Sequence, residues 1–399
     1  MKDIFKAVRI SKHVYWVGAI DWNVRDFHGY LTKRGSTYNA YLVLADKPTL
    51  IDTVRASFQD EMMARIASVI NPGDIQYIIS NHSELDHSGC LPDVIDAIRP
   101  EKVFTSVMGA KTLREIFHRE LSLIPLKDGD SLSLGNMTLS FLETRMLHWP
   151  DSMFSYLADE QVLFSQDAFG MHLASSQRFD DEVPPAILRF EAATYFANIL
   201  TPYAALISKL LSRVSAAGLN FSIIAPDHGP VWRKDIQGIL NHYTEWANQV
   251  PARKAVVLYG TMWHSTEKMA LAITEGLISN GVEVKWMSMD ACHRSDVAYE
   301  LLDAGALIAG SSTLNNNMLP GMADILTYLR GLKPKIPFGA AFGSYGWSGE
   351  APCQIQEILA GMKVEMIGDP VQTRHAPDPD VLAQCHDTGR LAAEKIKNL

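Results

Sequence analysis

Two patterns of hydrophobic and polar residues follow one another along the chain. In the first part, short apolar runs are separated by tight polar turns, as in the runs 38–44 and 48–52. Further pairs of runs lie at 132–134 with 137–142 and at 154–157 with 162–164. Runs of this length joined by turn residues predict antiparallel hairpins. Helical patterns lie between them at 58–70 and 92–98.

After Pro251 the pattern changes to short buried runs that alternate with helical stretches. The expected strands are 255–259, 282–286, 306–310, 336–341 and 364–367. Strands and helices in alternation predict a doubly wound parallel sheet. A chain of 399 residues is too long for one ordinary core. We therefore expect two domains, residues 1–250 and residues 251–399.

Composition and charge exclude several classes of protein. The chain is 47% hydrophobic without an apolar run long enough to span a bilayer, so we expect no membrane segment. Its start lacks the apolar core of a signal peptide, which favours a cytoplasmic location. A net charge of −9 without a basic stripe disfavours nucleic acid as a partner. The four cysteines form no C-x-x-C pair, which argues against a disulfide framework or a thiolate metal module.

The densest cluster of reactive side chains follows the apolar run 75–80. Two imidazoles and two carboxylates lie within six residues there: His82, Glu84, Asp86 and His87. A strand that ends in such a cluster directs its side chains into one small volume. Packing does not explain four potential ligands at this spacing, so the cluster predicts a metal site.

Three further strand ends carry one potential ligand each: His148, Asp167 and His228. The full set then holds seven side chains, which is too many for one metal ion. Two metal ions that share a carboxylate can use all seven, and Asp167 is the natural bridge. Other histidines lack such a context: His13, His118, His242, His293, His375 and His386. His172 follows Asp167 closely but is not expected to be a ligand.

Glu84 bears on the choice of metal. A set made mainly of imidazoles suits zinc. A carboxylate in place of an imidazole hardens the site and adds negative charge, which favours a metal that cycles between +2 and +3. Iron or manganese thereby gains over zinc, and zinc stays an alternative because it also accepts carboxylates.

A hydroxyl-rich loop follows the expected strand 255–259 and leads into a helix. Backbone N–H groups and hydroxyls converge there at the positive end of the helix dipole, which favours an anion. The loop lacks both the lysine of a Walker loop and the G-x-G-x-x-G pattern. It predicts a site for a monophosphate held by neutral donors, with simple helix capping as the alternative. The candidate residues are Thr261, Met262, Trp263, His264, Ser265 and Thr266.

Two more polar loops follow later strands of the same expected sheet. Ligands of open α/β sheets bind beyond the carboxyl ends of the strands. The candidates in these loops are Ser312, Thr313, Leu314, Asn315, Ser344, Tyr345, Gly346 and Trp347. Amides and hydroxyls can hydrogen-bond an isoalloxazine ring, and the aromatic side chains can stack on it.

The pattern H-x-E-x-D-H from His82 to His87, with His, Asp and His at long intervals after it, resembles the metallo-β-lactamase fold in its flavodiiron version. Hydrolases of that fold usually carry histidine where Glu84 stands. The segments 22–29 and 37–41 also resemble flavodiiron proteins, and the second part resembles a flavodoxin. The resemblance covers nearly the whole chain. It implies an α/β and α+β architecture, an αβ/βα sandwich followed by a flavodoxin-like doubly wound parallel sheet.

The resemblance also implies roles for single residues. Two ligand sets would share Asp167, with His82, Glu84 and His148 for one iron and Asp86, His87 and His228 for the other. In some members the histidine that matches His87 is displaced and water takes its place. His28 and Tyr195 match positions beside the iron pair, with ordinary packing as the alternative.

The implied function is a flavodiiron oxidoreductase. FMN would collect electrons from a donor such as rubredoxin or a reduced deazaflavin, and a non-haem diiron site would reduce O2 to water or NO to N2O. No C-x-x-C module precedes the last residue, Leu399, so a separate donor is expected. The family further implies a head-to-tail homodimer, or a dimer of such dimers.

Two other functions stay open at the level of the sequence. One is a dizinc hydrolase of the metallo-β-lactamase fold fused to a flavodoxin domain. The other is a flavodoxin-type electron carrier whose first domain is an inactive scaffold. Both gas reactions would use the same ligands, so the pattern does not distinguish O2 from NO.

Overall fold

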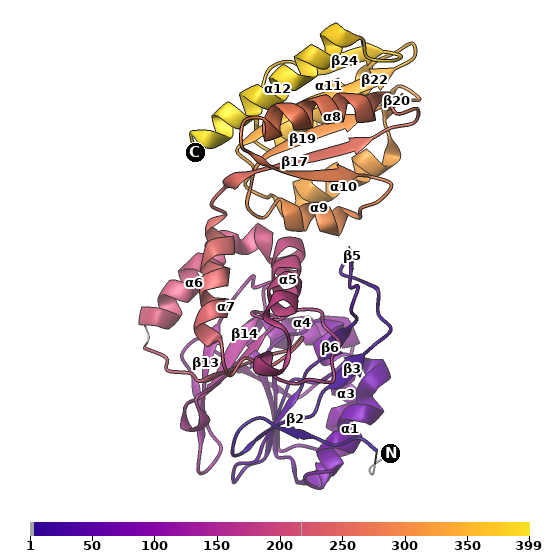
Figure 1. Ribbon diagram of the computed structural model, residues 1–399. Helices are drawn as coiled ribbons and strands as arrows, with labels where there is room; N and C mark the ends of the chain where they lie inside the picture. The colour runs from indigo at the N-terminus through magenta and orange to yellow at the C-terminus, as the bar shows by residue number, and fades with distance from the viewer. Residues whose placement is uncertain (1–3, 217) are drawn as a thin grey trace. The chain divides into compact units, whose positions relative to one another are not determined.

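The computed structural model describes residues 4–216 and 218–399, which fold into two compact units (Figure 1). The first unit comprises Met1–Tyr195 and Tyr203–Thr244. The second comprises Phe196–Pro202 and Glu245–Leu399. The chain therefore enters the second unit for seven residues before it finally leaves the first. The expected division at residues 250 and 251 stays a prediction.

The first unit contains, among its described residues, a seven-stranded and a five-stranded sheet. The larger sheet has the order β1 (Val8–Arg9), β2 (Val14–Trp16), β7 (Tyr41–Val43), β8 (Thr49–Ile51), β9 (Tyr77–Ser80), β10 (Lys102–Ser106) and β11 (Leu123–Leu126). The smaller has the order β12 (Ser131–Ser133), β13 (Thr138–Glu143), β14 (Met153–Leu157), β15 (Val162–Gln166) and β16 (Ile223–Pro226). Two ribbons pair β3 (Ala19–Asp21) with β6 (Ser36–Tyr38) and β4 (Asp26–Phe27) with β5 (Tyr30–Leu31).

Helices lie between and after these strands, and the segment Phe196–Pro202 and the end of the last of these helices belong to the second unit. The helices are α1 (Gln59–Ala67), α2 (Leu85–Ser88), α3 (Leu91–Ile98), α4 (Val107–Phe117), α5 (Pro185–Tyr195), α6 (Ala204–Ala216) and α7 (Ile236–Asn248). A π-helical stretch, Phe196–Leu200, continues directly from α5. Short 3-10 turns lie at Ala56–Phe58, Pro72–Asp74, Ala158–Glu160, Asp180–Glu182 and Thr201–Tyr203.

The three hairpins expected from the sequence are present. Tyr41 pairs with Ile51, Leu132 with Leu139 and Tyr156 with Leu163, each in antiparallel register. One apolar core contains side chains from both sheets, including Trp16, Tyr41, Phe141 and Phe164. A second core joins the larger sheet to α1 and α3. These contacts confirm the predicted sandwich of sheets and helices.

The arrangement of strands brings distant loops together. β8 to β11 run parallel in the larger sheet, and β15 and β16 run parallel in the smaller one. The loops after β9, β15 and β16 therefore leave from carboxyl ends of strands. These are the loops in which the sequence places most of the candidate ligands.

The second unit is a parallel sheet of order β18, β17, β19, β22 and β23, with β24 also paired to β22. Its strands are β17 (Ala252–Gly260), β18 (Glu283–Ser288), β19 (Ala304–Ser311), β22 (Phe338–Tyr345), β23 (Glu365–Met366) and β24 (Val371–Arg374), with a small hairpin of β20 (Thr313–Leu314) and β21 (Asn317–Met318). Its helices are α8 (Ser265–Ile278), α9 (Arg294–Glu300), α10 (Pro320–Leu332), α11 (Glu350–Gly361) and α12 (Pro379–Lys397). α8 packs beside α12, and α9 and α10 lie on the other face of the sheet (Figure 1). This is the predicted doubly wound topology.

The fifth strand differs from the expectation. The expected strand 364–367 forms only the two-residue β23, and the chain then leaves the sheet through Gly368, whose φ is +73°. It returns as β24, which pairs with β22 from Phe342↔Val371 to Tyr345↔Arg374. Pro370 has no N–H to donate, so it suits the interruption. β24 has the sequence Val-Gln-Thr-Arg. This mixed polar sequence lacks the apolar run by which the other strands were predicted.

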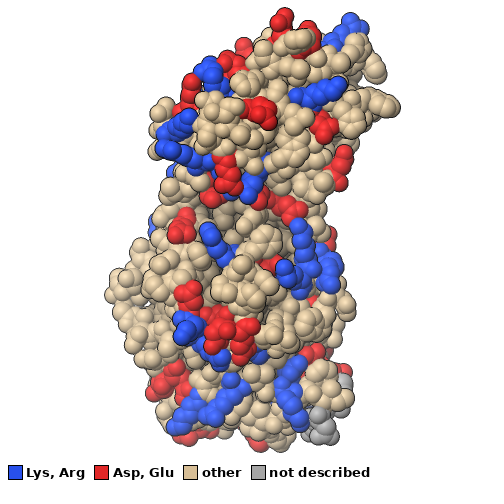
Figure 2. Space-filling model, in the orientation of Figure 1, with Lys and Arg blue, Asp and Glu red and all other residues tan. Residues whose placement is uncertain are grey.

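Acidic and basic side chains are interspersed on the face seen in Figure 2. Within the described ranges, no helix combines the length and the apolar character that a bilayer crossing needs.

Candidate metal centre and cofactor site

Three loops of the first unit supply six of the seven predicted ligands. His82 and Glu84 follow β9, and the single turn of α2 carries Asp86 and His87. The other loops carry Asp167 after β15 and His228 after β16. The seventh, His148, comes from the connection between β13 and β14. Most of these side chains are fully buried, and Glu84 and His148 keep 18% and 11% of their side-chain surface exposed.

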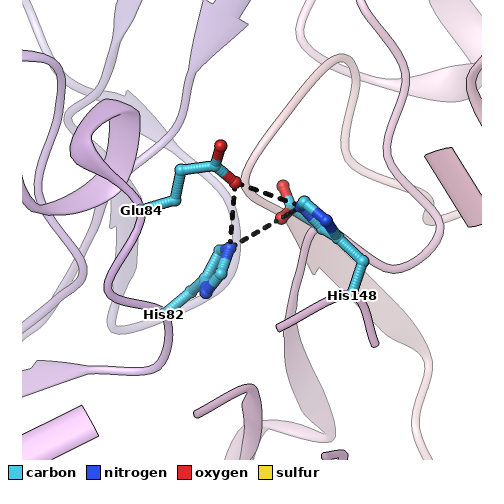
Figure 3. Close-up of side chains that lie close together, drawn as sticks. His82, Glu84 and His148 are labelled. Carbon is cyan, nitrogen blue, oxygen red and sulfur yellow. Dashed lines mark hydrogen bonds and ion pairs between the residues drawn. The ribbon is translucent and has the colours of Figure 1, made fainter. Parts of the chain in front are cut away.

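Four of the seven converge in a first set. Glu84 Oε2 lies 3.4 Å from His82 Nε2 and 3.1 Å from His148 Nε2. Asp167 Oδ2 lies 3.2 Å from His82 Nε2 and 3.1 Å from His148 Nε2. Figure 3 shows His82, Glu84 and His148 pointing toward one another.

The other oxygen of Asp167 belongs to a second set. Asp167 Oδ1 lies 3.2 Å from His87 Nε2 and 3.4 Å from His228 Nε2. Asp86 Oδ2 lies 3.2 Å and 3.1 Å from the same two nitrogen atoms. The structure thus places His87 with its Nε2 toward this set, and Asp167 stands between the two sets with one oxygen in each.

The donor atoms fit metal ions in spacing and in chemistry. An ion bound at about 2.1 Å sets neighbouring ligand atoms about 3.0 Å apart at right angles and about 3.4 Å apart at tetrahedral angles. Buried polar atoms without a hydrogen-bond partner among the described residues include both carboxylate oxygens of Asp86 and of Asp167, and the Nε2 atoms of His87, His148 and His228. Buried charges are normally paired or bound to metals. Each set therefore has the form of a metal site.

Outer residues fix the orientation of the imidazoles. His82 Nδ1 lies 3.2 Å from Asp151 Oδ2, which also accepts a hydrogen bond from Ser83 N at 2.6 Å. His228 Nδ1 lies 2.6 Å from the carbonyl oxygen of Thr37. An N–H donated at Nδ1 leaves the lone pair of Nε2 free for a metal. Asp151 was not among the predicted residues, because an isolated aspartate in a loop carries no signal of its own.

A third outer contact lies behind His87. Its Nδ1 atom is 3.5 Å from Oδ2 of the fully buried Asp227. Burial, and then the carboxyl of Asp52, raise the pKa of Asp227 well above its usual value. Asp52 in turn accepts hydrogen bonds from the backbone and side-chain nitrogens of Asn81, at 2.6 and 2.8 Å, and so holds the start of the ligand loop.

Electrostatics inside the cluster oppose the cost of burial. Burial alone would raise the pKa of Asp167, but the surrounding imidazoles, His87 first, hold it well below its usual value. Burial alone would lower the pKa of His87, but Asp86, Asp167 and Asp227 raise it well above its usual value. A bound metal replaces these shared protons, because it needs the carboxylate and the neutral imidazole.

His28 and Tyr195, the two residues predicted to lie beside the metals, each lie near a predicted ligand, and the Tyr195 ring is 6.0 Å from that of His228. His28 Nε2 is 2.9 Å from Glu84 Oε1, the oxygen that does not face the first set. Tyr195 is fully buried, and its hydroxyl has no hydrogen-bond partner in the part of the chain that the structure describes. Burial, and then Asp167, raise the pKa of Tyr195 well above its usual value, so the hydroxyl keeps its proton.

His172 adds a residue that the sequence analysis set aside. Its ring lies 4.5 Å from the ring of His228 and 5.1 Å from that of Tyr195. Its Nδ1 atom is 2.7 Å from Ser36 Oγ, and it lies in neither ligand set. Burial, and then the imidazole of His228, lower the pKa of His172 well below its usual value, so the ring is neutral.

The second unit contains a cavity of about 600 Å³ beyond the carboxyl ends of its strands. The predicted residues that line it are Met262, Trp263, Ser265, Ser312, Thr313, Leu314, Asn315, Ser344, Tyr345, Gly346 and Trp347. Its volume lies within the range of about 300–1,000 Å³ that cofactor sites occupy. Trp263 and Trp347 are each 84% exposed, so both indoles are available to cover a planar ring.

Hydroxyl groups of lining residues and of buried neighbours gather beside this cavity at the start of α8. Thr266 Oγ1 lies 3.0 Å from Ser312 Oγ and 2.9 Å from Ser344 Oγ. Ser265 opens α8 and lines the cavity. Thr261 Oγ1 is buried and, among the described residues, has no hydrogen-bond partner. This set of neutral donors at a helix N-terminus fits a phosphate monoester such as that of FMN.

The residues that line the cavity differ in part from those predicted. Thr261, His264 and Thr266 do not line the cavity, and His264 Nδ1 instead lies 2.6 Å from Glu267 Oε2. His375 and Ala376 do line it and were not predicted. They follow β24, the strand that the sequence analysis did not identify. A general rule would have found them, because ligands of such sheets lie beyond the strand ends.

A metallo-β-lactamase-like unit with two ligand sets, followed by a flavodoxin-like unit, defines a class of two-cofactor metalloflavoproteins. Family models agree, since one described as ODP family beta lactamase matches residues 37–229 and one described as Flavodoxin matches residues 257–389.

Relatives extend the likeness over the whole chain. A rubredoxin-oxygen oxidoreductase of Megalodesulfovibrio gigas is 47% identical, and a nitric oxide reductase of Moorella thermoacetica is 43% identical, each over 98% of both chains. The crystal structure of the flavodiiron protein from Giardia intestinalis superposes with a TM-score of 0.92 at 32% identity, over 98% of this chain and 97% of that one. The chain belongs to the flavodiiron protein family. It is an oxidoreductase, and its cofactors are FMN and a pair of non-haem irons.

Proposed function

We propose that this chain reduces O2 to water, NO to N2O, or both, at an iron pair held by the seven ligands, with electrons that pass through FMN from a rubredoxin-like donor. One observation carries the proposal. Asp167 offers one oxygen to each of two ligand sets, with 3.1–3.4 Å between its oxygens and the four imidazole nitrogens. The names of the two bacterial relatives, which specify oxygen and nitric oxide, support this substrate class.

The cofactors and the side chains divide the chemistry. When bound, the irons supply coordination positions and electrons, and FMN supplies the path by which a donor protein refills them. His82, Glu84 and His148 would hold one iron, and Asp86, His87 and His228 the other. Asp167 would contribute one oxygen to each, so the two ligand sets share one side chain.

Both reductions consume protons, and two residues beside the ligands would donate hydrogen bonds at the site. The Tyr195 hydroxyl is protonated, buried and without a partner among the described residues, so it can donate a hydrogen bond to a bound diatomic molecule. His28 can donate from Nε2 to Glu84 Oε1 and hold that carboxylate in its ligand orientation. We propose these roles for the two residues.

The flavin would occupy the cavity of the second unit. The hydroxyls of Ser265, Ser312 and Ser344 would hold the phosphate at the start of α8, and the buried Thr266 would position the last two. The exposed indoles of Trp263 and Trp347 would cover the ring. A ring that remains near the surface can receive electrons from a docked donor protein.

We further propose a head-to-tail homodimer, alone or as a dimer of such dimers. Each unit exposes apolar side chains near its own cofactor site. Leu85, next to two ligands, is 52% exposed, and Trp347 at the flavin cavity is 84% exposed. Contact between these surfaces of two copies would bury both. Light scattering on Trp347→Asp and Leu85→Asp should show loss of the dimer, and a monomeric wild-type protein would refute this arrangement.

One experiment tests the proposed function. Protein with its iron and FMN quantified is reduced without oxygen and then given O2 or NO in separate assays. Turnover of at least one gas is expected. No turnover of either gas by fully loaded protein would refute the proposal in favour of an electron carrier. Zinc without iron in protein from its native source would favour a hydrolase.

A further inference from the structure

A second cavity lies in the first unit, apart from the ligand atoms. It has a volume of about 280 Å³ and lies between α6 and the segment that joins β13 to β14. Its lining residues are Asp128, Glu143, Thr144, Arg145, Leu147, Leu206, Lys209, Leu210 and Arg213. The four residues from α6 have the spacing of one helix face.

The floor of this cavity is apolar, and its rim is charged. Leu147 and Leu210 are buried, and Leu206 is 38% exposed, so the leucines offer a surface for a small apolar body. Four of the charges at the rim are already paired. Arg145 makes two hydrogen bonds to Glu143, at 2.9 and 3.1 Å, and Arg213 makes two to Asp128, at 3.0 and 3.1 Å.

Two polar groups of the lining remain for a ligand. Thr144 is 4% exposed, and its hydroxyl has no hydrogen-bond partner within residues 4–216 and 218–399. A buried hydroxyl without a partner is costly, so its presence indicates a missing acceptor or donor. Lys209 is exposed and, within the same described ranges, has no ion pair.

We propose that this cavity is a binding site for a small organic monocarboxylate. The carboxylate would accept hydrogen bonds from the Lys209 ammonium and the Thr144 hydroxyl, and the apolar part would lie on the three leucines. Both arginines of the lining are paired with carboxylates, which leaves Lys209 as the cation of the lining available to a ligand and favours a single negative charge. A volume equal to that of about nine water molecules suits an acid of about ten non-hydrogen atoms.

The proposed site is connected to the metal centre by the backbone and by the hydrogen bonds of one glutamine. Leu147 directly precedes His148, and its carbonyl accepts a hydrogen bond from Gln166 Nε2 at 2.6 Å. Gln166 Oε1 in turn accepts from the backbone N–H of Asp167 at 2.7 Å. An acid packed on Leu147 would therefore restrain the loops that carry His148 and Asp167.

Calorimetric titration of the iron- and FMN-loaded protein with octanoate tests the site. We expect saturable binding at one site per chain. Octan-1-ol, which lacks the charge, and propionate, which lacks the apolar length, should bind at least tenfold more weakly. Lys209→Gln and Thr144→Val should each weaken octanoate binding roughly tenfold, as expected for loss of a hydrogen bond to a charged group. Lys111→Gln, an exposed lysine on α4 outside the cavity, should leave it unchanged.

Three results would overturn the proposal: no saturable binding of octanoate, equal binding of octan-1-ol, or octanoate affinity that neither variant changes. The link to the metals has its own readout. Octanoate should slow the release of iron to a chelator several-fold in the wild type and not in Thr144→Val. An unchanged release rate in the wild type would refute the restraint on the ligand loops.

Discussion

His28 Nε2 lies 2.9 Å from Oε1 of Glu84, and Oε2 of the same carboxylate faces the imidazoles of His82 and His148. One carboxylate thus joins an outer histidine to a ligand set. Because Glu84 is the residue that separates this site from an imidazole-rich zinc site, its orientation matters for the choice of metal and for reactivity.

Replacement of His28 by phenylalanine keeps an aromatic ring and removes the hydrogen bond. We expect turnover of the gaseous substrate to fall roughly 10–100-fold, as for other partners of metal ligands, with iron content near that of the wild type. Turnover and iron per chain are measured on the same samples. His28→Gln, which can still donate to Glu84, should recover part of the loss, and full activity in His28→Phe would contradict the role.

Replacement of Glu84 by histidine should shift the metal preference. The change removes a hard, charged ligand and adds an imidazole, which suits zinc. In cells supplied with equal iron and zinc, we expect the zinc-to-iron ratio of the purified protein to rise at least tenfold. Elemental analysis measures the ratio. The control is Glu84→Asp, which keeps a carboxylate, and an unchanged ratio in Glu84→His would show that Glu84 does not select the metal.

Oδ2 of Asp227 lies 3.5 Å from Nδ1 of His87. In Asp227→Ala this nitrogen loses its neighbouring carboxyl group, so His87 is held less firmly toward the second set. We expect iron affinity of that set to fall roughly 10–100-fold, so that iron content drops from the pair toward a single ion. Iron titration with a competing chelator measures this loss. The exposed substitution Asp303→Ala is the control. An unaltered iron affinity in Asp227→Ala would show that Asp227 does not support His87.

The hydroxyl of Thr266 contacts both Ser312 and Ser344. Thr266→Val keeps the shape of the side chain and removes these contacts, so the two serine hydroxyls of the cavity lose the group that orients them. FMN affinity should fall roughly several-fold, as expected for the loss of neutral hydrogen bonds. Fluorescence titration of the flavin-free protein measures the affinity. Thr388→Val on α12 serves as the control, and equal affinity in both variants would place the phosphate elsewhere.

Glu191 gives the stability of the protein a dependence on pH. Burial raises its pKa to about 7, although Arg34 at 3.0 Å and Lys33 oppose the shift. Between the ordinary glutamate pKa and 7 the folded state keeps a proton that the unfolded state releases, so stability falls as pH rises through 7. Between pH 6 and pH 8 the loss of this proton should lower the free energy of unfolding by about 1 kcal/mol.

Denaturant unfolding of the wild type and Glu191→Gln at the two pH values measures this decrease. The glutamine variant should gain about 1 kcal/mol over the wild type as the pH rises from 6 to 8. The exposed substitution Glu115→Gln should show no such gain. A constant difference between Glu191→Gln and the wild type at both pH values would exclude titration of Glu191 in this range.

Much of the fold and of the metal centre was predictable from local patterns. Ligands such as His82 and His87 lie within one short loop, and their spacing alone indicated a site. The flavin loops were visible because they follow strongly apolar strands. Both signals are local in sequence, and both kinds of residue lie at strand ends, where the topology brings them together.

Other features depend on contacts that the sequence pattern does not contain. His172 reaches the metal centre because the loop after β15 folds back beside His228, which no spacing rule indicates. His375 lines the flavin cavity because a polar edge strand returns to the sheet after an interruption. The unpartnered hydroxyl of Thr144 became visible only when its neighbours in space were known.

The shared carboxylate of Asp167 makes the two ligand sets depend on each other. An ion in one set would fix the side-chain rotamer of Asp167 and would displace the protons that it shares with the imidazoles. The second ion would then meet ligands that are already ordered and deprotonated, against the repulsion of the first ion's charge. The two sets are thus coupled through one side chain, and a change in either set should alter the iron affinity of the other.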